Sequence, residues 1–179
     1  QRLMLNRALS FIRSDAATTD ARVLDAACLD AMRGVLRHPD LDAAFKELVL
    51  TLPSETYIAE QLDVVDPQRV HAVREAMRVQ LARELLADWE WAWEAHHGNG
   101  AYRPDTVSSG RRALAGLALN MLCLTTRHSG DAVWPGKAYQ RCKDAGNMTE
   151  RFAALAALTG SGHELAAPAL QRFHTLFKD

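Results

Sequence analysis

The sequence predicts an all-α protein, built as an irregular two-layer superhelix of stacked helical hairpins. Apolar residues recur at intervals of three and four along almost the whole chain. No run of five or six residues alternates as a half-buried strand would. Helix-start and helix-end residues also follow one another at short intervals, so helix is expected to follow helix through brief connections.

Composition indicates one domain and excludes several classes of protein. The chain has 179 residues, of which 48% are hydrophobic and 24% charged, so it can bury a substantial core. No stretch approaches the ~20 uninterrupted apolar residues of a membrane span. The formal charge is −1. Arg69, Arg74, Arg78 and Arg83 share their helix with Glu75, Glu84 and Asp88, which predicts a solvated helix face and no nucleic-acid interface.

Three cysteines, Cys28, Cys123 and Cys142, lie far apart among apolar helical residues. An odd number of widely separated cysteines is typical of reduced core residues in a cytosolic protein. A cytoplasmic location is therefore expected.

The first third of the chain predicts two helices. Residues 1–11 begin in the middle of an amphipathic pattern with no cap in front, so we expect a longer parent chain that is truncated at both ends. Thr19 or Asp20 is expected to cap a second helix, which ends at His38 because the residue before Pro39 is pushed out of the helical region. The predicted buried face of this helix consists of Leu24, Cys28, Ala31 and Val35.

Two short helices and one long helix are expected next. Ser54 is predicted to cap a short helix that holds Ile58 and Leu62, and Asp66 with Pro67 marks the clearest helix start in the chain. The short helix before Pro53 is predicted to bury Leu41, Ala44, Phe45 and Leu48. The long helix is expected to run from about Pro67 to about His97, with a buried stripe of Val70, Val73, Met77, Leu81, Leu85, Trp89 and Trp93.

Each step of four residues rotates this stripe by about 40° around the helix, so the long helix changes its neighbours along its length. Such a helix suits a stacked, curved array better than a parallel bundle. Because no fixed-period repeat stands out, the array is expected to be similar in kind to HEAT or armadillo stacks without their consensus.

The last part of the chain predicts four more helices. Residues 98–100 end the long helix, and residues 103–105 lead into the next. Pro135 argues against a helix over residues 127–136, so the helix is expected to restart near Lys137. Asn147 is a predicted N-cap. The Glu150 side chain, three residues later, can accept a hydrogen bond from the backbone N–H of Asn147. The helix after residue 105 is predicted to have an apolar stripe of Leu114, Leu117, Ala118, Met121, Leu122 and Thr125. The turn at residues 160–162 precedes a final helix that contains Leu165, Leu170, Phe173, Leu176 and Phe177.

No catalytic, cofactor-binding or metal-binding residue is predicted. His163 and Glu164 begin like the zinc-protease motif HExxH, but Ala167 stands where the second histidine is needed. His71 and Glu75 have i, i+4 spacing and are expected to form a helix-surface pair.

His96 and His97 are expected to interact with the carbonyl groups at their helix end. Among the tryptophans, Trp89 and Trp93 fit the core stripe. Trp91 points to the opposite side and must find a second helix, a partner domain or solvent, which makes it an interface candidate.

Several short motifs occur in the order found in one protein family. They are residues 52–55, 58–60, Asp63, 66–67 and 73–75, then Tyr102, Arg112, Leu114 and finally 145–150. Together they resemble the C-terminal helical domain of the bacterial aminopeptidase N family of M1 zinc alanyl aminopeptidases. Two local departures are Glu150, where the family often has Asp, and the segment 134–136, which is usually helical.

The resemblance implies that the parent protein removes N-terminal residues from peptides by zinc-dependent hydrolysis. This domain would then cap the parent's own catalytic domain and restrict the access of short peptide substrates. The zinc motif HExxH, its third ligand and the Gly-x-Met-Glu-Asn motif lie in a catalytic domain that these residues lack. The chain alone is therefore expected to be inactive and free of metal, with no membrane or nucleic-acid partner.

Two alternatives come from other classes of protein. One is a stand-alone helical-repeat module that binds a protein or peptide, which would need polar outer helices. The other is an all-α transcriptional regulator, which would need a basic recognition helix that is not evident. The final helix has many large apolar residues, so residues 165–177 are expected to expose an apolar patch and to favour self-association.

Overall fold

A computed structural model describes residues 1–14, 16–98 and 100–178, without the side chains of residues 128 and 129. These residues form helices and no strand, which confirms the all-α prediction. None of the described helices is long and apolar enough to cross a membrane. The helices are α1 (Arg2–Arg13), α2 (Ala26–Arg37), α3 (Ala43–Leu50), α4 (Glu55–Ala59), α5 (Pro67–Glu84), α6 (Leu86–His96), α7 (Thr106–Ser129), α8 (Val133–Asp144), α9 (Met148–Ser161) and α10 (Ala166–Phe177).

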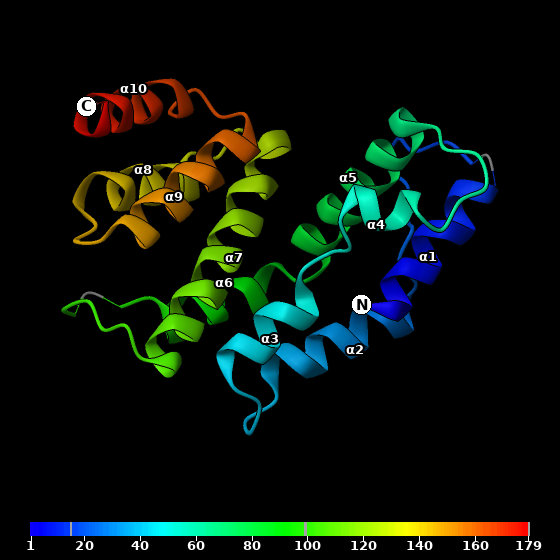
Figure 1. Ribbon diagram of the computed structural model, residues 1–179, viewed down its shortest axis with the longest axis horizontal. Coiled ribbons are helices and arrows are strands. Elements are labelled where there is room, and N and C mark those ends of the chain that lie inside the picture. The colour runs from blue at the N-terminus through cyan, green and yellow to red at the C-terminus, as the bar shows by residue number, and fades with distance from the viewer. Residues whose placement is uncertain (15, 99, 179) are drawn as a thin grey trace.

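The helices stack around α7, which packs against α3, α5, α6, α8 and α9 (Figure 1). Helices α1, α4 and α5 lie on one side of α7, and α8, α9 and α10 lie on the other, so the two chain ends are far apart (Figure 1). The apolar core runs through both groups and includes the predicted residues Leu114, Ala118, Met121 and Leu122 of α7. This is the helical superhelix that the sequence predicts.

Helix α3 approaches α7 closely at Gly110. A methyl group at Gly110 would lie 2.8 Å from the backbone nitrogen of Ala44. Glycine is therefore required here for close approach and not for its backbone angles.

The predicted long helix is interrupted at Leu85, where φ is −111° and ψ is 24°. The carbonyl of Leu81 accepts two hydrogen bonds, one from the Leu85 N–H at 3.2 Å and one from the Trp89 indole N–H at 3.0 Å. A side chain that inserts into the helical ladder is a recognised cause of a kink. The prediction of a single helix over residues 67–97 is thus wrong at one residue, and the predicted stripe is buried on both sides of the break.

Helix α2 begins later than predicted. Its cap is Asp25, which accepts from the Cys28 N–H at 2.9 Å, and neither Thr19 nor Asp20 serves as the cap. The preceding segment is held away from helical geometry because the Gln80 side chain bonds both backbone groups of Leu24. The buried face of α2 is Cys28, Leu29, Met32 and Leu36, while Ala31 is exposed and Val35 is half-buried.

Helix α3 buries the face opposite to the predicted one. Phe45 and Leu48 are 46% and 59% exposed, whereas Leu50 is buried and the Lys46 side chain is only 4% exposed. The Lys46 ammonium lies 5.7 Å from the centre of the Trp91 ring. A cation on an aromatic face explains how lysine occupies a position that sequence alone assigns to solvent.

Trp91 packs against a second helix, α2, which is one of the three alternatives that the sequence left open (a second helix, a partner domain or solvent). The Arg37 guanidinium of α2 lies 4.5 Å from the Trp91 ring centre. Arg37 and Arg33 also hold the buried carboxylate of Asp88, with their Nε atoms at 2.7 and 3.1 Å from its oxygens. Trp89 and Trp93 are buried in the core, as predicted.

Helix α8 begins at Val133, earlier than the predicted restart at Lys137. Pro135 is its third residue, in the first turn, where the missing N–H has no partner within the helix. Trp134 and Pro135 are both buried, so packing favours the helix there.

Asn147 caps α9 as predicted and accepts from the Glu150 N–H at 3.0 Å. The partner of the Glu150 carboxylate differs from the prediction, which was the backbone N–H of Asn147. The carboxylate accepts from the Asn147 side-chain amide at 2.8 Å and pairs with Arg141 at 2.8 Å.

Candidate functional site: a charged groove along α5

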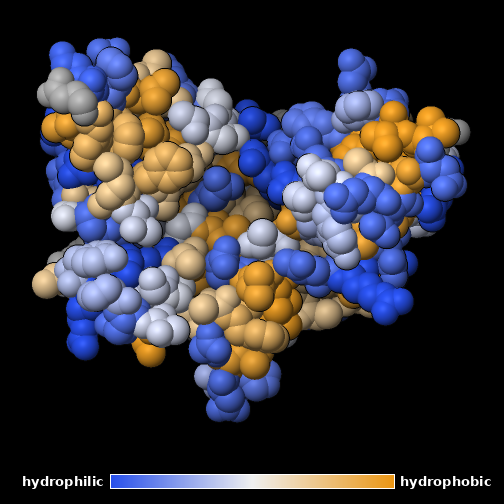
Figure 2. All heavy atoms as spheres, viewed as in Figure 1, coloured by the Kyte–Doolittle hydropathy of each residue, from blue (hydrophilic) through white to orange (hydrophobic). Residues whose placement is uncertain are grey.

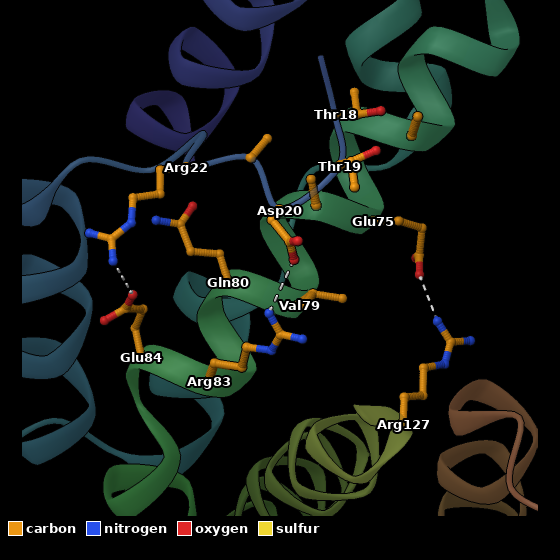
Figure 3. Close-up of a pocket in the computed structure, with 13 residues that line it drawn as sticks. Thr18, Thr19, Asp20, Arg22, Glu75, Val79, Gln80, Arg83, Glu84 and Arg127 are labelled. Carbon is orange, nitrogen blue, oxygen red and sulfur yellow. Dashed lines mark ion pairs between the residues drawn. The ribbon is translucent and has the colours of Figure 1, made fainter. Parts of the chain in front are cut away.

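A groove of about 620 Å³ runs beside α5 and is the candidate functional site (Figure 3). One wall is the segment 18–22, the floor is one face of α5, and Arg127 from the end of α7 stands across from them (Figure 3). The α5 residues that line it are Ala72, Glu75, Ala76, Val79, Gln80, Arg83 and Glu84.

The segment 18–22 is positioned by both backbone and side-chain chemistry. Asp20 has a φ of 51°, a left-handed conformation that aspartate tolerates better than most residues. Next to it, the Gln80 amide accepts from the Leu24 N–H at 2.8 Å and donates to the Leu24 carbonyl at 2.7 Å. Both partners are buried, so the chain after the turn is fixed against α5.

Three ion pairs cross or border the groove, and all are long. Arg22 lies 3.7 Å from Glu84, Arg83 lies 3.6 Å from Asp20, and Arg127 lies 3.8 Å from Glu75 (Figure 3). Charge-assisted hydrogen bonds are shorter, at about 2.7–2.9 Å. Exposed pairs at such distances contribute little to stability. The groove therefore presents separate positive and negative groups.

Glu75 lies between two arginines in the groove. Its carboxylate lies 3.3 Å from Arg78 and 3.8 Å from Arg127. Both arginines also donate to the carbonyl of Gly160, at 2.9 and 3.1 Å. These hydrogen bonds connect the end of α9 to α5 and α7.

Of the four α5 arginines predicted to form a solvated face, Arg83 is exposed, whereas Arg69, Arg74 and Arg78 are half-buried. Arg69 donates to the carbonyl of Phe11 at 3.1 Å and Arg74 to that of Pro53 at 2.8 Å. With Arg78, they connect α5 to the end of α1, to the chain before α4 and to the end of α9. The signal that sequence analysis missed is that arginine can donate to helix-end carbonyls as well as to carboxylates.

The described residues contain no group of three histidines, cysteines or acidic residues that could hold a metal ion. All three cysteines are buried and free, and burial raises the pKa of Cys123 to about 12. A thiol with such a pKa stays protonated and is a poor nucleophile. None of these cysteines lines the groove, and the described lining contains no nucleophile paired with a base. The charged residues of the groove can bind charged groups.

The histidines considered in the sequence have different partners in the structure. His71 contacts Glu55 at 2.8 Å and not Glu75, so the predicted His71–Glu75 pair is wrong. His163 accepts from the Leu165 N–H at 3.2 Å, while Glu164 is exposed. His97 lies 2.7 Å from the Trp93 carbonyl, which confirms its predicted role at the helix end.

His96 does not share this role. Both of its ring nitrogens are buried without a hydrogen-bond partner among the described residues. Burial lowers the pKa of His96, and the nearby cations Arg111 and Lys46 lower it further.

Comparisons with known proteins give the chain its family. Residues 1–179 match the family described as a domain of unknown function (DUF3458_C) with ARM repeats. The sequence is 33% identical to aminopeptidase N of Escherichia coli over 128 residues, which are 72% of this chain and 14% of that protein. It is 29% identical to aminopeptidase N of Caulobacter vibrioides over 145 residues, 81% of this chain and 16% of that protein.

The fold also matches a solved structure. It is the crystal structure of Legionella pneumophila aminopeptidase A in complex with aspartic acid, with a TM-score of 0.78 and 21% identity. The match covers 99% of this chain and 21% of that one. Against the two aminopeptidase N relatives, the chain spans only 14% and 16% of their lengths. The chain belongs to the DUF3458_C family of ARM repeats, as the C-terminal helical domain of a protein of the aminopeptidase N family.

Proposed function

We propose that the parent of this domain is a cytoplasmic zinc aminopeptidase, and that the domain caps its catalytic domain and restricts the access of peptides. The observation that carries the proposal is the family match over residues 1–179, together with 33% identity to aminopeptidase N of Escherichia coli. In this proposal the zinc is held by the catalytic domain of the parent protein. There it would activate the attacking water.

Within this proposal, the groove along α5 contacts peptide substrates. Arg22, Arg83 and Arg127 offer positive charge, and Asp20, Glu75 and Glu84 offer negative charge within the same groove. A peptide carries both signs, on its termini and its side chains. Because the ion pairs of the groove are long, a charged peptide can displace them at little energetic cost.

The experiment uses the full-length protein that contains this domain. The double substitution Arg22→Glu with Arg83→Glu reverses charge at the groove while leaving buried contacts intact. We expect kcat/KM for a ten-residue acidic peptide to fall several-fold, while kcat/KM for an alanyl anilide stays unchanged. The control is Arg172→Glu, an exposed change on α10 outside the groove. If kcat/KM for the acidic peptide were the same in the double variant as in Arg172→Glu, the proposed contact between the groove and peptides would be contradicted.

A further inference from the structure

Helix α3 presents an apolar face to solvent. Its exposed residues are Ala44, Phe45 and Leu48, which lie three and four positions apart and therefore on one side of the helix. No charged side chain of Ala43–Leu50 is exposed, because Lys46 is buried and Glu47 is half-buried. We call the three exposed residues the α3 face. A surface helix ordinarily turns charged residues towards water, whereas the core of a protein interface is depleted of charge and enriched in aromatic residues.

The orientation of α3 places its lysine inside and its phenylalanine outside. Phe45 and Leu48 are 46% and 59% exposed, while Lys46 is 4% exposed. Leaving large apolar groups in water and burying a cation are both unfavourable. The close approach of Ala44 to Gly110 of α7 fixes the helix in this orientation. The arrangement becomes favourable where another apolar surface covers the α3 face.

The first residue of the chain lies against the end of α3. The Gln1 side-chain amide donates to the Leu48 carbonyl at 3.0 Å. Leu3, two residues later on α1, is 44% exposed and extends the apolar surface at this point. Figure 2 shows apolar side chains gathered over α3, and Figure 1 shows the N-terminus on the same side of the molecule. Any chain that precedes residue 1 therefore reaches this domain beside the α3 face.

The place of this domain in its family indicates what covers the face. The chain is a C-terminal domain and spans 14% of the length of aminopeptidase N of Escherichia coli. The domain before it in such a protein is joined covalently to Gln1. A covalent connection keeps that domain at a high effective concentration next to α3, whereas a second copy of the chain must reach the face by diffusion.

We propose that the α3 face is the contact surface for the domain that immediately precedes residue 1 in the parent protein. Phe45 and Leu48 pack there against apolar groups of that domain. The inference rests on the proposed function, since a domain that caps its neighbour needs a fixed interface with it. It adds the residues that form this interface, which lie on a helix that does not line the groove along α5.

The first test is photo-cross-linking of the full-length parent protein. The substitutions Phe45→p-benzoylphenylalanine and Leu48→p-benzoylphenylalanine place a photoreactive ketone on the α3 face. After irradiation, we expect mass spectrometry to find cross-links within one molecule, from these two positions to residues that precede Gln1. The control is Val64→p-benzoylphenylalanine, in the segment after α4. Val64 is 87% exposed, and it should give no such cross-link.

The second test measures the thermal unfolding of the full-length protein. Leu48→Ser should lower the midpoint by several degrees, because the leucine loses its burial against the neighbouring domain. Val133→Ser is the matched control. Val133 is 56% exposed at the first position of α8, close to the 59% of Leu48, and its replacement should leave the midpoint nearly unchanged.

Three results would contradict the proposal. Absence of cross-links from positions 45 and 48 would mean that the α3 face is turned to solvent. Cross-links between two molecules alone would mean that a second copy covers it. Equal changes of the midpoint in Leu48→Ser and Val133→Ser would mean that the face has no partner. Neither measurement depends on turnover, so its failure is distinct from failure of the kinetic test of peptide access.

Discussion

The side-chain amide of Gln80 forms with Leu24 the pair of hydrogen bonds that a neighbouring strand would form. It accepts from the Leu24 N–H at 2.8 Å and donates to the Leu24 carbonyl at 2.7 Å. Both residues are buried, so water does not replace these bonds easily. One side chain of α5 thus fixes the path of the chain between α1 and α2, and with it one wall of the groove.

Gln80→Ala should destabilise the domain by about 2 kcal/mol or more, because two buried backbone groups lose their partners at ~1–3 kcal/mol each. Urea unfolding followed by circular dichroism measures the change. Gln68→Ala is the matched control, since Gln68 is exposed on the first turn of the same helix and should change stability by less than about 0.5 kcal/mol. Equal losses of stability in the two variants would contradict a stabilising role of the Gln80–Leu24 hydrogen bonds.

Gly110→Ala should cost about 1–3 kcal/mol, because the new methyl group meets the backbone of Ala44 and neither helix can yield without repacking. Gly34→Ala should have the opposite sign. Gly34 lies inside α2 with nothing within 4 Å of the added methyl group, so the higher helix propensity of alanine should stabilise by about 0.5–1 kcal/mol. Thermal unfolding of the two variants compares them directly.

Stability should decrease as the pH falls through the ordinary histidine pKa of 6.5, in part because of His96. The folded-state pKa of His96 is lowered, so below pH 6.5 the unfolded chain binds a proton that the folded chain does not. The unfolded state is then favoured increasingly with acid. His96→Phe should reduce the slope of the unfolding free energy against pH between pH 7 and pH 5, and a slope equal to that of the wild type would contradict this role of His96.

The purified chain should bind no stoichiometric zinc and should not cleave an alanyl anilide. The described residues offer no convergent set of three metal ligands, and a catalytic zinc needs at least three. Metal analysis together with the anilide assay tests both expectations. Turnover that a chelator abolishes would place the chemistry within this chain and would overturn its assignment to another domain.

The chain should self-associate through an aromatic patch on α9 and α10. Phe152, Leu170, Leu176 and Phe177 are 58%, 53%, 51% and 47% exposed, and Figure 2 shows apolar side chains gathered at this end of the molecule. The expected exposure within residues 165–177 is therefore confirmed, and association through it stays a prediction.

Light scattering of the wild type and of Phe177→Ser measures this association. Phe177→Ser should shift the mass distribution towards monomer, because it removes one exposed aromatic ring of the patch. The centre of this ring lies 4.8 Å from the centre of the Phe173 ring. Val107→Ser is the control, at a residue that is 72% exposed on another helix. The same mass distribution in wild type and Phe177→Ser would rule out this patch as the contact.

Local signals in the sequence were sufficient to predict most helix boundaries. Ser54, Asp66 and Asn147 each cap the helix expected of them, because cap chemistry involves residues two or three positions apart. The core stripe of α7 was also predictable, since its spacing is regular. The break at Leu85 was not, because it requires the Trp89 indole to reach the Leu81 carbonyl within an otherwise regular pattern.

Contacts distant in sequence account for the other differences. The start of α2 depends on Gln80, which is 56 residues from Leu24. The buried face of α3 depends on the stacking of Lys46 on Trp91, which a hydrophobicity pattern counts as unfavourable. The groove was not predicted, because its residues come from three parts of the chain and form no motif along it.

The joints at Phe11, Pro53 and Gly160 consist of arginine side chains bonded to backbone carbonyls. A carbonyl does not titrate, and arginine remains charged far above neutral pH. The curvature of the superhelix should therefore withstand mild acid, even where the core becomes less stable. Small-angle X-ray scattering at pH 7 and at pH 5 would then give the same radius of gyration for the folded chain.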